Sequence, residues 1–245
     1  VVVIGAAALF IVLSGFSGLK DFSLSFSNAF DPDLKAQPKK GKFFNVSPNQ
    51  EQALLSLRGV ASYSKEIEEK VYLSHKDKSQ IAFLKGVDTA YNQVISIDSA
   101  IYAGAWNLDQ QGVIGIGLAN ILSLSVQDYY SPLKILVPRP LKKKEGTSSF
   151  GNKPYTEAAI SMSGIYAIEA DIDEKYLFTS LPFAQRLLEK SPFEVSGINI
   201  KLRPTADADL LALQISQIFQ EKVMVKTRSQ LNSSLYKMLN TENIA

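Results

Sequence analysis

The chain has 245 residues, of which 46% are hydrophobic, 20% charged and 10% aromatic. This composition can bury a core in one large domain or two small ones, and it excludes a disordered chain. The formal net charge of +2 gives no indication of nucleic-acid binding, and the absence of cysteine excludes disulfides, thiol nucleophiles and thiolate metal sites.

The N-terminal segment is apolar. Residues 1–13 read VVVIGAAALFIVL, and the first charged residue is Lys20. A membrane-spanning helix needs about 20 predominantly apolar residues, and the segment shows neither the basic n-region nor the small-residue cleavage site of a signal peptide. We therefore expect residues 1–18 to be the trailing part of a truncated transmembrane helix.

A stalk helix is predicted over residues 19–30. Phe22, Phe26 and Phe30 recur at helical spacing, and the Asp-Pro pair that follows them ends the pattern.

Residues 34–57 predict two short strands followed by a helix. The sequence LKAQPKKGKFFNVS places a basic turn at residues 38–41 between the strands. In SPNQEQALLSL, Ser47 is positioned as an N-cap, Pro48 as the first helical residue and Glu51 in the first turn, so a short helix should follow.

Residues 60–87 alternate between polar and apolar side chains and predict two long antiparallel strands that turn near residues 75–79. His75, the only histidine, lies at this turn. We expect it to be a surface residue, because a lone histidine lacks the partners that catalysis needs.

The segment QGVIGIGLANILSL contains three glycines in the order G-x-x-G-x-G. Nucleotide-binding loops require G-x-G-x-x-G or G-x-x-x-x-G-K-[ST], so the segment is not interpreted as a phosphate site. We expect a helix over about residues 114–124 instead. One face of that helix would carry Ile114, Leu118, Ile121 and Leu122.

The sequence SPLKILVPRP predicts a strand that two prolines end. The following stretch, LKKKEGTSSFGNKPYT, is polar, contains glycine and has little to bury, so we expect a protruding hairpin over residues 139–155. The hairpin is basic: the single anion Glu145 accompanies the cations Arg139, Lys142, Lys143, Lys144 and Lys153.

The C-terminal third predicts more strands and helices. A long strand or strand pair over residues 157–180 precedes a helix with Pro182 near its start. A strand in GINIKLRP, a helix capped by Thr205 or Asp207 and a strand in KVMVKTR follow, and an amphipathic helix runs from residue 229 to the end.

The first and last parts of the chain together predict a split β-α-β layer, into which a β-rich middle is inserted. The fold class is therefore α+β.

We expect no enzyme and no cofactor. The chain lacks the G-x-S-x-G and H-E-x-x-H signatures. Trp106 is interpreted as a core or hinge aromatic residue, with an apolar groove for lipid as the alternative. Two groups of carboxylates are interpreted as turn and cap residues: Asp171, Asp173 and Glu174, and Asp207 and Asp209.

Several short segments follow one another along nearly the whole chain: GFSGL after the apolar run, FLKGVD, IGIGLANILSLSVQD then LKILVP, SGIY then LPFAQRLLEK, and the terminal LYKMLNTENIA. In this order they resemble the extracytoplasmic domain of MacB/FtsX-like ABC transporter permeases, and they are most similar to the lipoprotein-releasing (Lol) permeases. The chain departs from the family at Val126-Gln127-Asp128, where Gly-Asp is usual.

The resemblance implies a domain between two membrane helices of the cell inner membrane, with the bulk of the chain in the periplasm. It implies a porter-like subdomain split over residues 31–90 and 196–228, and a β-rich, sabre-like subdomain over residues 91–195. Residues 229–245 would form a second membrane-proximal stalk helix. The implied partners are a separate ABC ATPase subunit and a second permease subunit, in a homo- or heterodimer.

In the hook-bearing subunit of lipoprotein-releasing permeases, a hairpin at the place of residues 139–155 grips a periplasmic lipoprotein chaperone. The basic pair that follows the hairpin there is replaced here by Thr156-Glu157 after Tyr155. The resemblance implies Lys134, by position and charge, as a partner-binding residue. The charge and aromatic content of the hairpin add the candidates Arg139, Lys142, Lys143, Lys144, Phe150 and Lys153, with a solvated loop tip as the alternative for Lys142–Lys144.

The resemblance implies that the domain couples cytoplasmic ATP hydrolysis to the extraction or hand-over of lipoproteins. The alternatives are a MacB-like efflux permease, an FtsX-like mechanotransmission permease, and a membrane-tethered enzyme.

Overall fold

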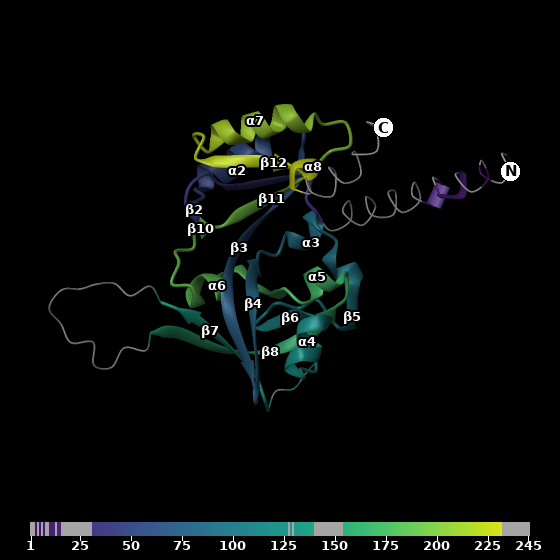
Figure 1. Ribbon diagram of the computed structural model, residues 1–245. Coiled ribbons are helices and arrows are strands. Elements are labelled where there is room, and N and C mark those ends of the chain that lie inside the picture. Colours follow the sequence, from purple (N-terminus) through teal and green to yellow (C-terminus); the bar gives the residue numbers. More distant parts are fainter. Residues whose placement is uncertain are drawn as a thin grey trace.

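The computed structural model describes residues 31–126, 128, 130–139 and 154–231, together with single positions between 3 and 15 (Figure 1). The first elements are β1 (Leu34–Pro38), β2 (Phe44–Asn45), α2 (Pro48–Ser56), β3 (Val60–His75), β4 (Lys78–Val87), α3 (Tyr91–Val94) and the 3-10 helix η1 (Ile97–Ala100). The middle elements are β5 (Ile101–Gly104), β6 (Gln111–Gly115), α4 (Ile116–Leu122), β7 (Leu133–Pro138), β8 (Tyr155–Tyr166), α5 (Ala170–Asp173), β9 (Tyr176–Ser180) and α6 (Leu181–Leu187). The last elements are β10 (Glu194–Val195), β11 (Gly197–Leu202), α7 (Ala208–Ile218), β12 (Val223–Thr227) and α8 (Arg228–Leu231).

One half of the molecule joins the first and last parts of the chain. Its strands follow the order β12-β1-β11-β3, and α2 and α7 lie together beside them (Figure 1). We call this half the split layer. Its buried side chains include Leu34, Leu54, Ile198, Leu211 and Phe219.

The described chain enters and leaves the split layer at one place. Leu34 is opposite Thr227 in the antiparallel pair of β1 and β12, and an ion pair of 2.6 Å joins Asp33 to Arg228. The segments that precede Asp33 and follow Arg228 therefore start side by side.

The other half is a closed ring of strand pairings, which we call the strand ring. β3 pairs with β4, β4 with β9, β9 with β6, β6 with β8, β8 with β7, and β7 again with β3. Helices α4 and α6 contribute Leu118, Leu122, Leu181 and Ala184 to its apolar core. β3 belongs to both halves, because residues 60–66 pair with β11 and residues 66–75 pair with β4.

Most predicted elements are confirmed. β3 and β4 are the two long strands, and they turn at Lys76 and Asp77. Ser47 caps α2 in a capping box with Gln50, whose Oε1 accepts the Ser47 N–H at 2.9 Å. Of the two candidate caps of α7, Asp207 is the one observed, since its side chain accepts from the N–H groups of the first turn.

The segment 157–180 is neither one strand nor one paired hairpin. β8 and β9 are separated by α5, and each of them pairs with β6. Trp106 packs into an aromatic cluster, stacked on Tyr91 with ring centroids 6.1 Å apart and tilted against Phe178 at 5.3 Å. Trp106 is half-buried and packs against the buried aromatic core, which agrees with its interpretation as a core residue.

The glycine-containing segment differs from the predicted helix at its start. Residues up to Gly115 form strand β6, so Ile114 is buried in a strand, and Ile121 on α4 is 38% exposed. The glycines allow close packing: a Cβ at Gly115 would lie 2.1 Å from the carbonyl oxygen of Asp173. The segment is therefore structural, as expected.

Several predictions fall outside the described residues. They are most of the membrane helix at 1–18, of which the structure describes only single helical positions, the stalk at 19–30, the hairpin between residues 140 and 153, and the C-terminal helix beyond residue 231. Among the residues that are described, no helix combines the length and the apolar character needed to cross a membrane. The division into porter-like and sabre-like subdomains at residues 31–90, 91–195 and 196–228 stays a prediction.

Candidate functional site

The predicted hairpin, which we call the arm (residues 139–155), starts where β7 ends and finishes where β8 begins. Pro138 is opposite Tyr155 in the antiparallel β7–β8 pair, and the Arg139 N–H donates to the Pro154 carbonyl at 2.9 Å. The described ends of the arm are thus held together as a hairpin requires. The remaining predicted site residues lie outside the described part of the chain: Lys142, Lys143, Lys144, Phe150 and Lys153.

Lys134 and Arg139, the two described site residues, do not lie on one face. Lys134 is exposed, whereas its strand neighbours Leu133 and Ile135 are buried in the ring, so its side chain points outward. Arg139 has the opposite parity along the strand. Its Nε donates to Thr156 Oγ1 at 3.0 Å, and its guanidinium pairs with Glu189 just beyond α6.

An open cleft of about 560 Å³ lies beside the base of the arm. Its lining residues are Arg139, Tyr155, Thr156, Glu157, Ala158 and Ala159. The cleft is formed largely along one strand, β8, which suits contact with a protein surface better than enclosure of a small substrate.

The junction between the two halves contains a buried carboxylate that the sequence did not reveal. Glu66 on β3 is opposite Gly197 of β11 on one side and Val87 of β4 on the other, which places it where the strand changes partner. Only 1% of Glu66 is exposed. A carboxylate at this depth requires charged or hydrogen-bonding partners.

The partners of Glu66 come from both halves. The Nζ of Lys35, on β1 of the split layer, lies 2.6 Å from Oε1, and the Nζ of Lys85, on β4 of the ring, lies 3.1 Å from Oε2. The Asn199 side chain also donates to Oε2 at 2.7 Å. We call these four residues the junction cluster.

The charges of the junction cluster stabilise one another. Burial by itself would raise the pKa of Glu66, but Lys35 and Lys85 outweigh it and hold that pKa well below its ordinary value. Burial would lower the pKa of Lys85, and the Glu66 carboxylate outweighs this effect and raises it. Glu66 and Lys85 are therefore both charged over the ordinary pH range.

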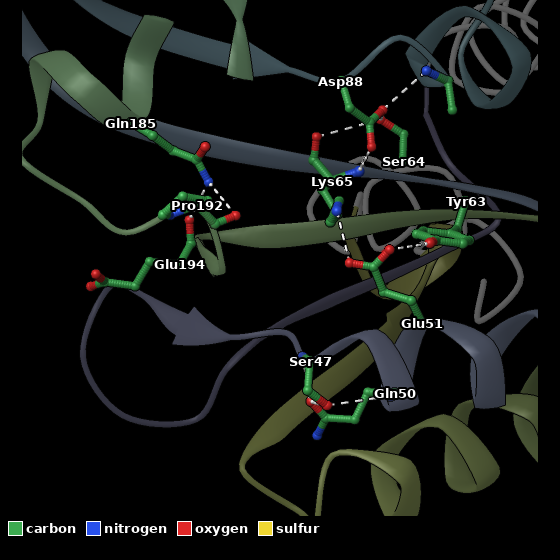
Figure 2. A network of polar contacts seen from close by, with 11 residues as sticks. Ser47, Gln50, Glu51, Tyr63, Ser64, Lys65, Asp88, Gln185, Pro192 and Glu194 are labelled. Carbon is green, nitrogen blue, oxygen red and sulfur yellow. Dashed lines mark hydrogen bonds and ion pairs between the residues drawn. The ribbon is translucent and has the colours of Figure 1, made fainter. Parts of the chain in front are cut away.

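A second polar network connects α2, β3 and the turn after β4 (Figure 2). Lys65 Nζ lies 2.8 Å from Glu51 Oε1, and the Tyr63 hydroxyl donates to Glu51 Oε2 at 2.8 Å. On the other side, Asp88 accepts from the Lys65 N–H at 2.8 Å and from the Ser64 hydroxyl at 2.7 Å. Burial, assisted by the Glu51 carboxylate, raises the pKa of Tyr63. These contacts fix the first half of β3 from several sides.

His75 is not a surface residue, contrary to the prediction. It is 2% exposed, and its Nδ1 lies 2.8 Å from the carbonyl oxygen of Leu122 at the end of α4. The turn itself is exposed, but α4 packs against the neighbouring strand β4 and its C-terminal end reaches the His75 ring. The contact attaches α4 to the tip of the β3–β4 hairpin, which is a structural role.

Of the carboxylates near α5, Asp173 acts as a turn residue, as interpreted. Asp173 Oδ1 accepts the Ile168 N–H at 2.9 Å and closes the turn before α5. In the part of the chain that the structure covers, no group of three or more His, Asp or Glu side chains could hold a metal ion.

No protein-family model matches the chain. The lipoprotein-releasing system transmembrane protein LolE of Haemophilus influenzae is 22% identical over 183 residues, which cover 73% of this chain and 39% of that protein. The chain thus spans about two fifths of the length of this curated relative.

Two crystal structures share the fold. The periplasmic region of MacB from Actinobacillus actinomycetemcomitans superposes with a TM-score of 0.53 and 11% identity, over 83% of this chain and 92% of that one. The extracellular domain of the ABC-type transporter YknZ from Gram-positive bacteria gives 0.52 and 11%, over 80% of this chain and 99% of that one. The similarity to the periplasmic region of MacB confirms a mixed α+β fold with a barrel-like sheet.

Proposed function

We propose that this chain, which has the fold of the extracytoplasmic domain of MacB-like ABC transporter permeases, carries movement from the membrane to a protein partner outside it. The observation that supports this role is the side-by-side entry and exit of the chain at Asp33 and Arg228. Because the segments before Asp33 and after Arg228 join the split layer at the same point, a displacement of both segments would move the split layer as a unit.

The movement would start at the membrane. A separate ABC ATPase subunit on the cytoplasmic side would hydrolyse ATP and displace the segments 19–30 and 229–245. The split layer would then turn with them, and β3, which is continuous through 16 residues, would carry the displacement into the strand ring. No catalytic residue is required in this chain, and a second permease subunit would complete the transporter.

The proposed cargo is a lipoprotein of the inner membrane. The similarity to LolE supports this choice, and so does an arm of hook length directly after Val137-Pro138. The similarity to MacB supports efflux or mechanotransmission as the second candidate, because the same fold would serve a permease without lipoprotein cargo.

The arm would bind a soluble periplasmic partner such as a lipoprotein chaperone. Its lysines at 142–144 and 153 would attract an acidic surface and act mainly on the association rate. Phe150 would provide an apolar anchor in the bound complex, since aromatic residues dominate small interfaces.

Deletion of residues 141–152 from the full-length permease tests this proposal. We expect the variant to reach the membrane and fold, and to lose lipoprotein release in cells. Replacement of Lys142, Lys143 and Lys144 by Ser is the finer variant, which should slow partner association and reduce its dependence on salt. Normal folding together with normal lipoprotein release in the deletion variant would overturn the role of the arm. Absence of lipoprotein release by the unchanged permease would overturn the cargo assignment in favour of efflux or mechanotransmission.

A further inference from the structure

The outside of the strand ring carries an apolar row that crosses three adjacent strands. On β3, Val71 and Leu73 are buried in the ring, whereas Tyr72 between them is 42% exposed. The register places Tyr72 opposite Ile81 of β4, which is 55% exposed, and opposite Leu136 of β7 on its other side. We call Ile81, Tyr72 and Leu136 the outer row.

The outer row is not a set of isolated surface residues. Side chains directly opposite one another on one face of an antiparallel pair are about 4.5–5.5 Å apart at Cβ, so the three form one continuous strip. The solvent face of an antiparallel sheet is ordinarily polar, and contiguous apolar strips on a soluble surface commonly mark interaction sites.

Lysines border the outer row on its own face. Lys70 precedes Tyr72 by two positions on β3, and Lys134 precedes Leu136 by two positions on β7. The side chains of both lysines therefore point to the same outer face as the row. Both are exposed. The acidic residues on the same face are Glu157 of β8, opposite Leu136, and Glu68, two positions before Lys70 on β3.

Glu68 and its neighbour Glu69 are already engaged in ion pairs. Glu68 lies 3.8 Å from Lys85, and Glu69 lies 2.6 Å from Lys42. The charge that this face presents around its apolar centre is therefore mainly positive.

We infer that the outer row with Lys70 and Lys134 is a docking surface for an acidic protein segment that offers apolar side chains. An apolar centre with a charged rim is the ordinary arrangement of a protein interface, and the positive rim selects a negative partner. The surface is built from described strands and shares only Lys134 with the predicted partner-binding residues, so it does not depend on the cargo proposed above.

A protein occupant fits this face better than a lipid surface. Membrane-surface binding uses amphipathic helices that insert a wide apolar face, whereas the outer row is one narrow strip on a sheet. The β3–β4 hairpin also runs away from the split layer, where the chain enters and leaves (Figure 1).

The test measures binding of two synthetic peptides, one alternating Glu and Leu and one alternating Lys and Leu, to the full chain. We expect the acidic peptide to bind and the double variant Tyr72→Ser/Ile81→Thr to bind it about tenfold more weakly or worse. The charge-reversed variant Lys70→Glu/Lys134→Glu should lose the acidic peptide and gain the basic one. Leu213→Ser, which changes an exposed leucine on α7, is the matched control and should bind like the unchanged chain.

Melting temperatures of all variants distinguish loss of binding from loss of folding. The conservative variant Tyr72→Phe should keep binding. Three results would overturn the inference: no binding of the acidic peptide, equal weakening by Leu213→Ser, or binding to phosphatidylglycerol vesicles that shows the same dependence on the outer row. The last result would identify a membrane-facing surface instead.

Discussion

The junction cluster and the outer face of the strand ring both contain charged residues of β3, but these charges have opposite roles in the two regions. At the junction, Glu66 and Lys85 are buried and bonded to each other. A few residues further along the strand, Lys70 is exposed at the edge of an apolar row. A buried charge ties the fold to one arrangement, because removing a partner leaves the other charge unsatisfied. An exposed charge adds little to stability and is available for binding.

The largest effect is expected at the junction. Glu66→Ala leaves two lysines facing each other in a buried site, and such unpaired charges cost about 3–5 kcal/mol. Urea unfolding monitored by circular dichroism measures the loss. Lys134→Ala, an exposed lysine on a neighbouring strand, is the control and should change stability by no more than about 0.5 kcal/mol.

A second variant sharpens this test. Replacing Glu66, Lys35 and Lys85 together by apolar residues of similar size should recover much of the lost stability, since no buried charge then remains. Equal stability of Glu66→Ala and Lys134→Ala would remove the distinction between the two regions.

The long alternating strands and the capped helices could be predicted from the sequence because their signals are local. Alternation over residues 60–87 requires no knowledge of the rest of the chain, and Ser47 with Gln50 forms its capping box within a single turn. The boundary at Gly115 was misplaced because a short apolar run with glycines fits a strand and a helix equally well.

The junction could not be predicted, for a physical reason. Glu66 lies in the same charged, alternating stretch as Glu68 and Glu69. It is the buried one because β3 changes its pairing partner there, from β11 to β4. The prediction for His75 was wrong for the same reason. Its position at a turn suggested that the side chain is exposed to solvent, but the end of α4, distant in sequence, contacts it. Both depend on contacts between segments far apart in the chain.

The second prediction compares two positions on α4 that the sequence pattern treated alike. Leu118 is 0% exposed and Ile121 is 38% exposed. Leu118→Ala should therefore cost about 2–5 kcal/mol through the cavity it leaves, whereas Ile121→Ala should cost much less. Thermal unfolding measures both, and similar losses at the two sites would contradict the burial of Leu118. Addition of ATP or NAD should leave both melting temperatures unchanged, because the glycine segment is structural.

The third prediction concerns acid. The folded-state pKa of Glu66 lies below the unfolded value of 4.5, so its contribution to stability is complete above that pH and is lost as pH falls below it. The slope for one proton is about 1.4 kcal/mol per pH unit. Lys85 behaves oppositely: its raised pKa contributes stability below 10.5 that is lost only as pH rises further.

Unfolding free energies measured between pH 6 and pH 2 on the unchanged chain and on Glu66→Gln test the acid prediction. The variant should begin less stable and lose less stability across this range. Parallel curves would show that the acid sensitivity resides in other carboxylates.

The smallest effect is expected at the base of the arm, where Arg139 and Glu189 form an ion pair with 41% and 56% of their side chains exposed. An exposed pair of this kind contributes about 0–1 kcal/mol, and salt screens it. Arg139→Ala should therefore lower stability slightly at low ionic strength and not measurably at about 1 M salt, where the Debye length falls to about 3 Å. Arg228→Ala is the matched comparison, because its pair with Asp33 is only 20% and 25% exposed and should resist salt better.

If Arg139→Ala instead cost as much as Glu66→Ala at both salt concentrations, the arm would be anchored as firmly as the junction. Its base would then belong with the charges that define the fold and not with those left available for a partner.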